Sequence, residues 1–295
     1  MRWSSCALVG LAVIASCAAT APPRAGIQHV VIVIVDGLRP DAIAAASAPN
    51  LQRWMKTAAT TLEARTAHPA TLPAHMSMVT GLAPARHGVS WNTDRGQVYD
   101  GPTLFTVVHA AGLRTALLTG ESKLTMLAPP GSADLYAGPA PGNGHLERGA
   151  AAALAARFAQ DFAREGFALT LVHFDETDAA GHRHGWMSPG YLAAVGVADH
   201  ALGTILDAIA ASGRAGSTAV LVTADHGGER DNHGVGRGET SWLIPFACQG
   251  QGLAPARIAG TVTHLDLAPT VLALLGLPAL PGAEGRVIPE CLVKP

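Results

Sequence analysis

Val30-Val31-Ile32-Val33-Ile34-Val35-Asp36-Gly37 places six β-branched residues without interruption before an acid and a glycine. A continuous apolar run of this length is typical of a strand that is buried on both faces, as in a parallel sheet. Shorter runs of the same kind recur at Thr115–Leu118, Leu169–Val172, Ala219–Val222 and Leu243–Ala247. The sequence therefore predicts a central sheet in which most strands are parallel.

Helical segments lie between these runs, and the clearest extends from Gly190 to Ala211. Its apolar residues recur at helical spacing and form one face: Leu192, Val195, Ala198, Leu202, Ile205 and Ile209. Strands that alternate with helices are typical of an α/β domain in which helices flank a mostly parallel sheet. Since no repeat or change in composition divides the chain, we expect one layered α/β domain over residues 27–295.

The composition indicates a globular protein that does not bind nucleic acid. Hydrophobic residues make up 48% of the 295 residues, which is enough for a buried core. The formal net charge is −2, and there are only five Trp and three Tyr. A nucleic-acid duplex is bound through a basic field and single strands through aromatic platforms, and this composition favours neither.

The start of the chain has the pattern of an export signal. Arg2 supplies a positive charge, and Leu8–Ile14 is an apolar stretch too short to span a bilayer. Ile14-Ala15-Ser16-Cys17 resembles a bacterial lipobox, so we predict a signal peptide over residues 1–16, a lipid anchor on Cys17 and a tether over residues 17–26. The alternative is an ordinary signal peptide cleaved near residues 19–21. Both interpretations predict export to the periplasm, and the first also predicts attachment to a membrane.

Two cysteines remain outside the predicted signal and anchor. Cys248 and Cys291 would lie in an oxidising compartment, where a disulfide between them can form and persist. The alternative is a pair of buried free thiols. Sequence spacing does not give the Cα separation that a disulfide needs, so both alternatives stay open.

Acidic residues follow three of the predicted strands. Asp36 ends the first run, Asp178 lies shortly after the third, and Asp225 follows the fourth. Ligands bind beyond the carboxyl ends of parallel strands, so we expect these side chains to meet. His182 and His226 stand beside the second and third acids. Carboxylate and imidazole ligands together suit zinc or a similar divalent ion.

The motifs occur in a specific order along the chain. They are Asp36-Gly37-Leu38-Arg39, Thr71-Leu72-Pro73-Ala74-His75, Thr80-Gly81, His87-Gly88-Val89, Asp178-x-x-Gly181-His182, Asp225-His226-Gly227 and His233-Gly234. This ordered set resembles the alkaline phosphatase superfamily, and within it the type I phosphodiesterase/nucleotide pyrophosphatase branch. The resemblance covers residues 29 to about 277. It implies an alkaline phosphatase-like layered fold and an enzyme that hydrolyses phosphate esters.

The resemblance also implies two zinc ions per chain. One would be held by Asp36, Asp225, His226 and the Thr71 oxygen. The other would be held by Asp178, His182 and His233. Two metals about 4 Å apart can stabilise both the attacking and the leaving oxygen of an in-line displacement. His264 is the alternative to His233, because it precedes a segment that resembles the last helix of the superfamily.

Thr71 is the nucleophile that the resemblance implies, since zinc coordination activates a hydroxyl. Pro73 suits the first turn of a helix that extends to about Thr80, so Thr71 would lie near a helix N-terminus, where negative charge is favoured. The alternative role of Thr71 is that of a helix cap. In the family an Asn at the position of Asn92 donates to a phosphoryl oxygen, and a turn-forming Asn is the alternative here.

Two further residues near the site need an assignment. The spacing acid-x-x-Gly-His selects Asp178 as the ligand and leaves Asp175 either a role in supporting the ligands or a structural role. Lys123, in Gly120-Glu121-Ser122-Lys123-Leu124, resembles a substrate-facing lysine region of the phosphonoacetate hydrolase branch. A solvated surface lysine is the alternative.

The sequence thus favours a phosphodiesterase or nucleotide pyrophosphatase that acts on a small-molecule phosphate ester through a phospho-threonine intermediate. A phosphomonoesterase and a phosphonate hydrolase are the close alternatives. A sulfatase is disfavoured, because Thr71-x-Pro73-x-His75 stands in place of that branch's Cys/Ser-x-Pro-x-Arg. A zinc-binding surface lipoprotein without turnover is an alternative of another class, although such a protein needs neither a nucleophile nor an oxyanion donor.

Overall fold

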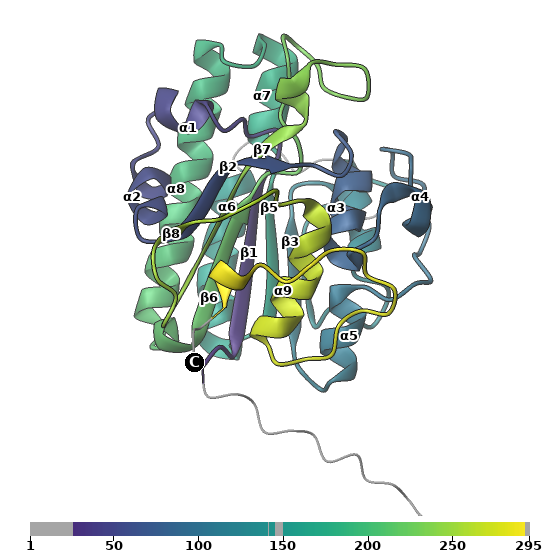
Figure 1. Ribbon diagram of the computed structural model, residues 1–295. Helices are drawn as coiled ribbons and strands as arrows, with labels where there is room; N and C mark the ends of the chain where they lie inside the picture. The colour runs from purple at the N-terminus through teal and green to yellow at the C-terminus, as the bar shows by residue number, and fades with distance from the viewer. Residues whose placement is uncertain (1–25, 141, 145–149, 293–295) are drawn as a thin grey trace, which may run out of the picture.

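The computed structural model describes residues 26–140, 142–144 and 150–292, and its centre is one eight-stranded sheet (Figure 1). The strands are β1 (His29–Val35), β2 (Ala59–Arg65), β3 (Thr115–Thr119), β4 (Leu135–Ala137), β5 (Leu169–Phe174), β6 (Thr218–Thr223), β7 (Leu243–Gly250) and β8 (Ala256–Arg257). Their order across the sheet is β4-β3-β5-β1-β6-β7-β2-β8. All five predicted strands are present.

Strand β1 lies in the middle of the sheet because its side chains are apolar on both faces. Every residue of β1 is buried, and Val30–Ile34 have no exposed surface. It pairs in parallel with β5 on one side and with β6 on the other. Among the described strands only β7 runs antiparallel to its neighbours, β6 and β2, so the prediction of a mostly parallel sheet is confirmed.

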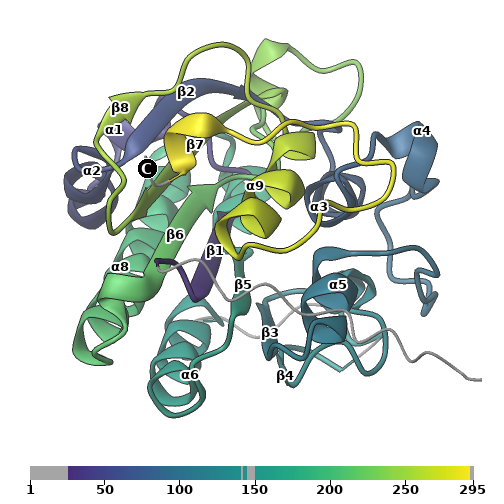
Figure 2. The same cartoon turned by 60° about the horizontal axis from the view of Figure 1, so that its bottom comes forward.

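Helices cover both faces of the sheet, as Figures 1 and 2 show. The helices are α1 (Ala42–Ala45), α2 (Pro49–Met55), α3 (Thr71–Thr80), α4 (Pro84–His87), α5 (Leu104–Ala110), α6 (Ala150–Glu165), α7 (Glu176–His184), α8 (Pro189–Ala211) and α9 (Leu267–Leu274). Helix α8 packs against α6, α7, α2 and α1 on one side, whereas α3, α5 and α9 pack together on the other. The predicted α/β layered architecture is confirmed.

Helix α8 agrees with the predicted helix to within one residue at its start. Ser188 caps it by accepting a hydrogen bond from the Tyr191 backbone N–H, and a proline occupies its first position. By length and composition alone this helix could cross a bilayer. Its buried face packs on α6 and α7 instead, as expected for a core helix.

Three strands were not predicted. Strand β2 mixes Thr, Glu and Arg with Ala, and its register against β7 shifts between Thr61 and Ala64, so its side chains show no clean alternation. Strand β4 has three residues and β8 has two, and both lie at an edge of the sheet. Segments this short are ordered by pairing with a neighbour rather than by a pattern of their own.

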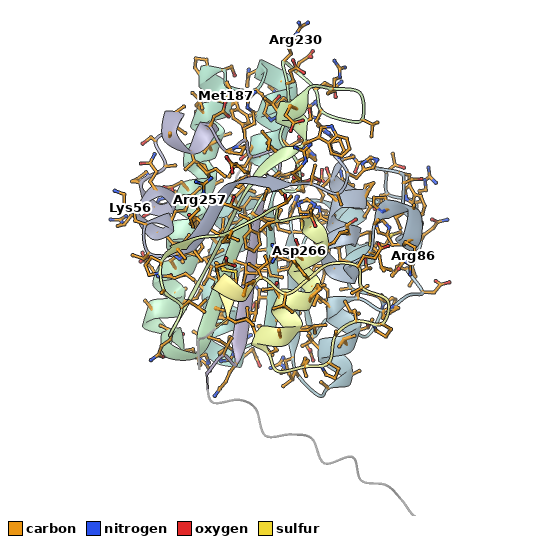
Figure 3. All side chains as sticks on the ribbon, in the orientation of Figure 1. Lys56, Arg86, Met187, Arg230, Arg257 and Asp266 are labelled. Atoms are coloured by element: carbon orange, nitrogen blue, oxygen red, sulfur yellow. A yellow bond between two sulfur atoms is a disulfide. The ribbon has the colours of Figure 1, made fainter. Side chains whose placement is uncertain are left out.

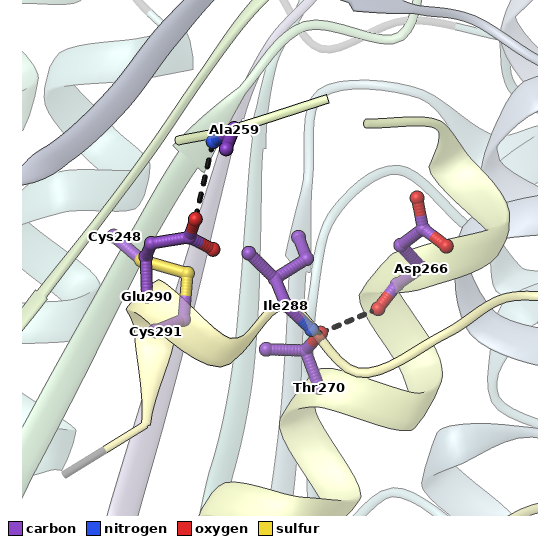
Figure 4. Close-up of a disulfide and its surroundings, with 7 residues drawn as sticks. All are labelled: Cys248, Ala259, Asp266, Thr270, Ile288, Glu290 and Cys291. Atoms are coloured by element: carbon purple, nitrogen blue, oxygen red, sulfur yellow. Dashed lines mark hydrogen bonds between the residues drawn. A yellow bond between two sulfur atoms is a disulfide. The ribbon is translucent and has the colours of Figure 1, made fainter. Parts of the chain in front are cut away.

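Cys248 and Cys291 form a disulfide, with their Cα atoms 5.7 Å apart (Figure 4). It ties the short 3₁₀ turn at Pro289–Cys291 to β7. Near it, the Ala259 N–H donates to the Glu290 carboxylate. Of the two alternatives for these cysteines, the disulfide is the one formed. The predicted signal peptide, Cys17 and the tether up to residue 25 lie outside the described residues.

The strand order brings three chain segments to one edge of the sheet. Since β1 lies between β5 and β6 and all three run in parallel, their carboxyl ends are neighbours. Asp36 directly follows β1, α7 follows β5, and Asp225 follows β6 after one residue. This edge, at the top of Figure 1 below α7, is where the predicted site lies.

Candidate active site

A cavity of about 590 Å³ opens at the carboxyl edge of the sheet. Its lining includes most of the residues predicted for the site: Thr71, Asn92, Lys123, Asp178, His182 and His233. The other predicted ligands, Asp36, Asp225 and His226, have no exposed surface and lie beneath it. Residues far apart in the sequence are therefore brought together as the motif order implies.

Thr71 is the first residue of α3 and is almost completely buried, with 1% of its surface exposed. Ala70, in an extended conformation, occupies the N-cap position. The alternative role of Thr71 as the helix cap is therefore wrong. The N-terminus of this helix is the positive end of its dipole, and it favours negative charge beside the Thr71 hydroxyl.

Asn92 is fixed beside Thr71 by one hydrogen bond. Its side-chain carbonyl oxygen accepts from the Leu72 backbone N–H at 2.8 Å. With that oxygen engaged, the NH₂ group is the part of the side chain that can donate to a ligand. The geometry suits the predicted role of a neutral donor to an oxyanion.

The first group of candidate metal ligands is Asp36, Asp225 and His226. One ligand atom from each residue lies within 4.8 Å of the others. His226 Nε2 is 3.4 Å from Asp36 Oδ1 and 3.3 Å from Asp225 Oδ2. These three residues belong to the first ligand set expected from the sequence.

The second group contains Asp178, His233 and, again, His226. Asp178 Oδ1 is 3.7 Å from His233 Nε2, and the His226 and His233 rings stack with centroids 3.8 Å apart. His182, one helical turn after Asp178, approaches the other carboxylate oxygen at 3.4 Å. Its side chain is 40% exposed and lies outside the compact group. The structure thus places His226 between both groups, which the sequence did not indicate.

The three histidines share one hydrogen-bonding pattern. In each ring Nδ1 donates to a backbone carbonyl: His182 to Asp231 at 3.0 Å, His226 to Gly227 at 2.9 Å and His233 to Pro69 at 2.8 Å. A proton on Nδ1 leaves Nε2 with a free lone pair, and in each case Nε2 is the atom near a carboxylate. This arrangement orients imidazoles for metal binding.

His264, the alternative to His233, uses both ring nitrogens elsewhere. Nε2 donates to the Ala224 carbonyl at 2.9 Å, and Nδ1 accepts from the Ala67 N–H at 3.4 Å. Burial lowers the pKa of His264 to about 4, so the ring is neutral at physiological pH. The structure therefore places His233, and not His264, among the candidate ligands.

Burial close to other carboxylates disfavours the charged forms of Asp36 and Asp178. Burial, together with Asp225 and Asp178, raises the pKa of Asp36 well above its usual range. Burial also raises the pKa of Asp178 to about 6, although His226 and His182 oppose this. Several buried polar atoms lack a hydrogen-bond partner here: Asp36 Oδ1, Asp178 Oδ1, Asp225 Oδ2 and His226 Nε2. Converging oxygen and nitrogen atoms of this kind fit a divalent metal such as zinc.

Lys123 is held in the cavity wall by an ion pair. Its Nζ lies 2.7 Å from Glu121 Oε2, and the two side chains are only 13% and 4% exposed. The alternative of a solvated surface lysine is therefore wrong. Burial alone would lower the pKa of Lys123, but Glu121 and Asp36 outweigh it and raise the pKa. Lys123 thus presents a fixed positive charge to the cavity.

His173 belongs to the site but was missed in the sequence. It has no exposed surface, and its Nε2 donates to Asp36 Oδ2 at 3.0 Å. A lone imidazole in strand β5, whose other residues are apolar except for Thr170, is a signal that could have indicated it. Asp175 is buried at the N-cap of α7 and lines the cavity without belonging to either ligand group. This agrees with the choice of Asp178 as the ligand.

The match to a known family decides the class of protein. Residues 30–236 match the type I phosphodiesterase/nucleotide pyrophosphatase family. The chain belongs to this family. The branch that the sequence predicted is therefore confirmed, and the hydrolysis of phosphoric esters is the activity typical of this family.

Solved structures of low sequence identity share the fold of this family member. Mouse ectonucleotide pyrophosphatase/phosphodiesterase 5 superimposes with a TM-score of 0.72 at 16% identity, over 86% of this chain and 96% of the mouse chain. Phosphonate monoester hydrolase of Agrobacterium radiobacter has a TM-score of 0.72 at 15% identity, over 91% and 78% of the two chains. An alkaline phosphatase superfamily protein from Vibrio parahaemolyticus has a TM-score of 0.68 at 18% identity, over 92% and 70%.

One curated relative shares a segment of sequence with this phosphodiesterase family member. It is the 2,3-bisphosphoglycerate-independent phosphoglycerate mutase of Cereibacter sphaeroides, 33% identical over 132 residues. The match covers 43% of this chain and 24% of the mutase. The chain thus matches about a quarter of the length of that relative.

We predict that His233→Ala lowers the metal content of the protein by about one ion per chain, whereas His264→Ala leaves it unchanged. His233 Nε2 faces Asp178, and both nitrogens of His264 are occupied by hydrogen bonds within the protein. Metal analysis of both purified variants after equilibration with zinc measures the difference. The reverse pattern would assign the ligand role to His264.

Proposed function

We propose that this chain is a zinc-dependent phosphodiesterase or nucleotide pyrophosphatase that acts through a phospho-threonine intermediate on Thr71. One observation carries the proposal. Three imidazoles donate through Nδ1 to backbone carbonyls and present Nε2 to buried carboxylates, next to a buried threonine at a helix N-terminus. A nucleophile beside a ligand set of this kind is what metal-assisted ester hydrolysis requires.

Two zinc ions per chain are the cofactors we propose. The first would be held by Asp36, Asp225, His226 and the Thr71 oxygen. The second would be held by Asp178, His182 and His233, with His226 close to both. When bound, the metals supply charge that favours the deprotonated hydroxyl and neutralises the phosphoryl oxygens. Other divalent metals with a similar preference for nitrogen and oxygen ligands fit the same residues.

Each side chain of the site would have its own role in the reaction. Thr71 Oγ1 attacks phosphorus and its proton is lost to solvent, while the bond from phosphorus to the leaving oxygen breaks and that oxygen takes up a proton. Asn92 donates through its NH₂ group to a phosphoryl oxygen, and the N-terminus of α3 favours the added negative charge. Water then cleaves the phospho-threonine and restores the hydroxyl.

Two of the solved structures with this fold bear on the choice between a phosphodiesterase and a phosphonate hydrolase. The mouse phosphodiesterase was solved as an inactive threonine-to-alanine variant with AMP bound, which favours a threonine nucleophile and a nucleotide-type substrate here. The Agrobacterium neighbour is a phosphonate monoester hydrolase, which keeps a phosphonate substrate as the alternative. In both cases the substrate is a small molecule.

A diester is the substrate that the charges at the nucleophile favour. Next to Thr71 the chain offers the neutral Asn92, and His75 where the sulfatase motif has an arginine. A diester carries one negative charge, so less charge has to be neutralised in its transition state. Lys123 favours the alternative, because a fixed ammonium in the cavity wall could bind the second charge of a monoester or the carboxylate of a phosphonate.

Thr71→Ala should reduce turnover by about a thousandfold or more, as the loss of a nucleophile does in other hydrolases. The variant should still bind most of its zinc, because the carboxylate and imidazole ligands remain. A chromogenic phosphodiester assay and metal analysis measure both effects, and Thr71→Ser, which keeps a hydroxyl, is the matched control. Activity of Thr71→Ala within a few-fold of wild type would contradict the assignment.

A wild-type protein that binds zinc but turns over no ester would instead favour the non-catalytic zinc-binding lipoprotein.

Diesters should be cleaved with a higher kcat/KM than matched monoesters. The comparison uses an aryl phosphate and its methyl or phenyl diester, on wild type and on Lys123→Ala. If Lys123 contributes little to diester cleavage, Lys123→Ala should leave the diester value within a few-fold of wild type. A monoester preference that disappears in Lys123→Ala would refute the diesterase proposal and favour the phosphomonoesterase or phosphonate hydrolase.

Export as a periplasmic or outer-membrane-associated lipoprotein is also proposed, with the lipid anchor on Cys17. Cys17→Ser should release the protein from the membrane fraction, because one thiol would carry the whole anchor. Fractionation of cells that express both forms measures this. A wild-type protein that is already soluble would indicate the ordinary signal peptide.

A further inference from the structure

Trp186 follows α7 in a loop whose backbone is unusual. Among the described residues, Met187 and Arg230 are the two non-glycine residues with positive φ, at 66° and 55°. Figure 3 shows both at the upper end of the molecule, the end where the carboxyl ends of the strands lie. The Trp186 backbone N–H donates to the Arg230 carbonyl at 2.6 Å, so one strained residue makes this contact and the other, Met187, follows Trp186 directly. Such conformations persist where the surroundings hold them, often at functional sites.

The indole of Trp186 lies against the bare backbone of two glycines. A Cβ atom on Gly181 would lie 2.6 Å from the ring, and one on Gly228 would lie 2.1 Å from it. Any side chain at either position would displace the indole. Gly181 directly precedes His182, and Gly228 follows His226 after one residue. The ring is therefore seated on the backbones of both histidine motifs.

The indole also contacts two candidate ligands edge to face. Its ring centroid is 5.2 Å from that of His182, with an interplanar angle of 82°, and 6.0 Å from that of His233, at 74°. Contacts of this geometry are favourable and restrict rotation of the rings. His182 is 40% exposed, so the indole is one of few groups that hold this ring.

The Nε1 group of Trp186 contacts the backbone next to Asp36, which belongs to the first ligand group. Trp186 Nε1 donates to the Gly37 carbonyl at 2.9 Å, and the Tyr191 hydroxyl donates to the same oxygen at 2.9 Å. Gly37 follows Asp36, has a φ of 68°, and donates its N–H to Asp225 Oδ1 at 3.1 Å. Two donors to one carbonyl thus fix the turn that carries Asp36.

We infer that Trp186 is a positioning residue for the second metal site. Its indole would orient His182 and His233 and hold the Gly37 turn against them. The affinity for the second metal ion would then depend on this side chain, although it supplies no ligand atom. The inference rests on one part of the proposed function, namely that both ligand groups bind zinc.

Trp186→Phe tests the inference, because phenylalanine keeps an aromatic ring but removes the N–H donor and part of the ring area. Replacement of a residue that orients metal ligands typically weakens metal affinity about 10- to 100-fold. We expect a loss in this range for the second zinc equivalent and a smaller loss for the first, because the Nε1 donor to the Gly37 turn is removed as well. Zinc titration of the full chain against a competing chelator measures both equivalents. A large excess of zinc should restore phosphodiester turnover.

Trp54→Phe is the matched control. Trp54 is buried to a similar extent, with 7% of its surface exposed against 6% for Trp186, and its Nε1 has no hydrogen-bond partner. Its replacement should leave both zinc affinities unchanged, even if it lowers the melting temperature. Trp186→Tyr, which keeps an aromatic ring with a polar end, should weaken the second equivalent less and provides a milder test if Trp186→Phe folds poorly.

The outcomes separate the inference from the proposed function. If wild type binds two equivalents and Trp186→Phe binds both equally well, Trp186 is not a positioning residue. The same holds if Trp54→Phe weakens the second equivalent as much, since the effect would then be general destabilisation. If Trp186→Phe does not fold, an unchanged second equivalent in Trp186→Tyr overturns the inference. A wild-type chain that binds no second equivalent overturns the two-zinc proposal and the inference with it.

Discussion

Repulsion between buried carboxylates is the constraint on which this site depends. Asp36, Asp178 and Asp225 converge with exposed fractions from 0 to 14%, and burial of like charges is unfavourable unless cations balance them. His233 does not serve as such a cation, because burial lowers its pKa to about 3. Rings that hold their proton on Nδ1 present the Nε2 lone pair beside the carboxylates and form a ligand set with them.

The fold provides the rigidity that such a cluster requires. Asp36 and Asp225 leave the ends of adjacent strands in the apolar centre of the sheet, where β1 is buried on both faces. Asp178 stands on a helix that begins directly after the neighbouring strand β5. Displacement of any one carboxylate would therefore require a shift in the densely packed core. Burial of the apolar residues of these strands thus stabilises the fold that holds the unfavourable cluster of carboxylates together.

The sequence predicted the parts of this arrangement that follow from local pattern. Continuous β-branched runs indicated five strands, and acids at strand ends indicated the edge where the site lies. Three kinds of feature had no such signal. Strand β2 is ordered by its pairing with β7. His226 lies between both ligand groups, with its ring stacked on that of His233. Lys123 and Glu121 form a buried ion pair. The first arises from a contact between distant segments and the other two from packing in three dimensions, and spacing alone encodes neither.

The glycines in the histidine motifs have a packing role that the ligand pattern conceals. Gly181 stands between Asp178 and His182, where a ligand motif needs only a spacer, yet its missing side chain leaves the room that the Trp186 indole occupies. Gly228 does the same for the motif that begins at Asp225. One large side chain can therefore contact both motifs only because each contributes bare backbone. A motif of acids, histidines and glycines thus specifies the metal ligands and, through its glycines, the surface that keeps them aligned.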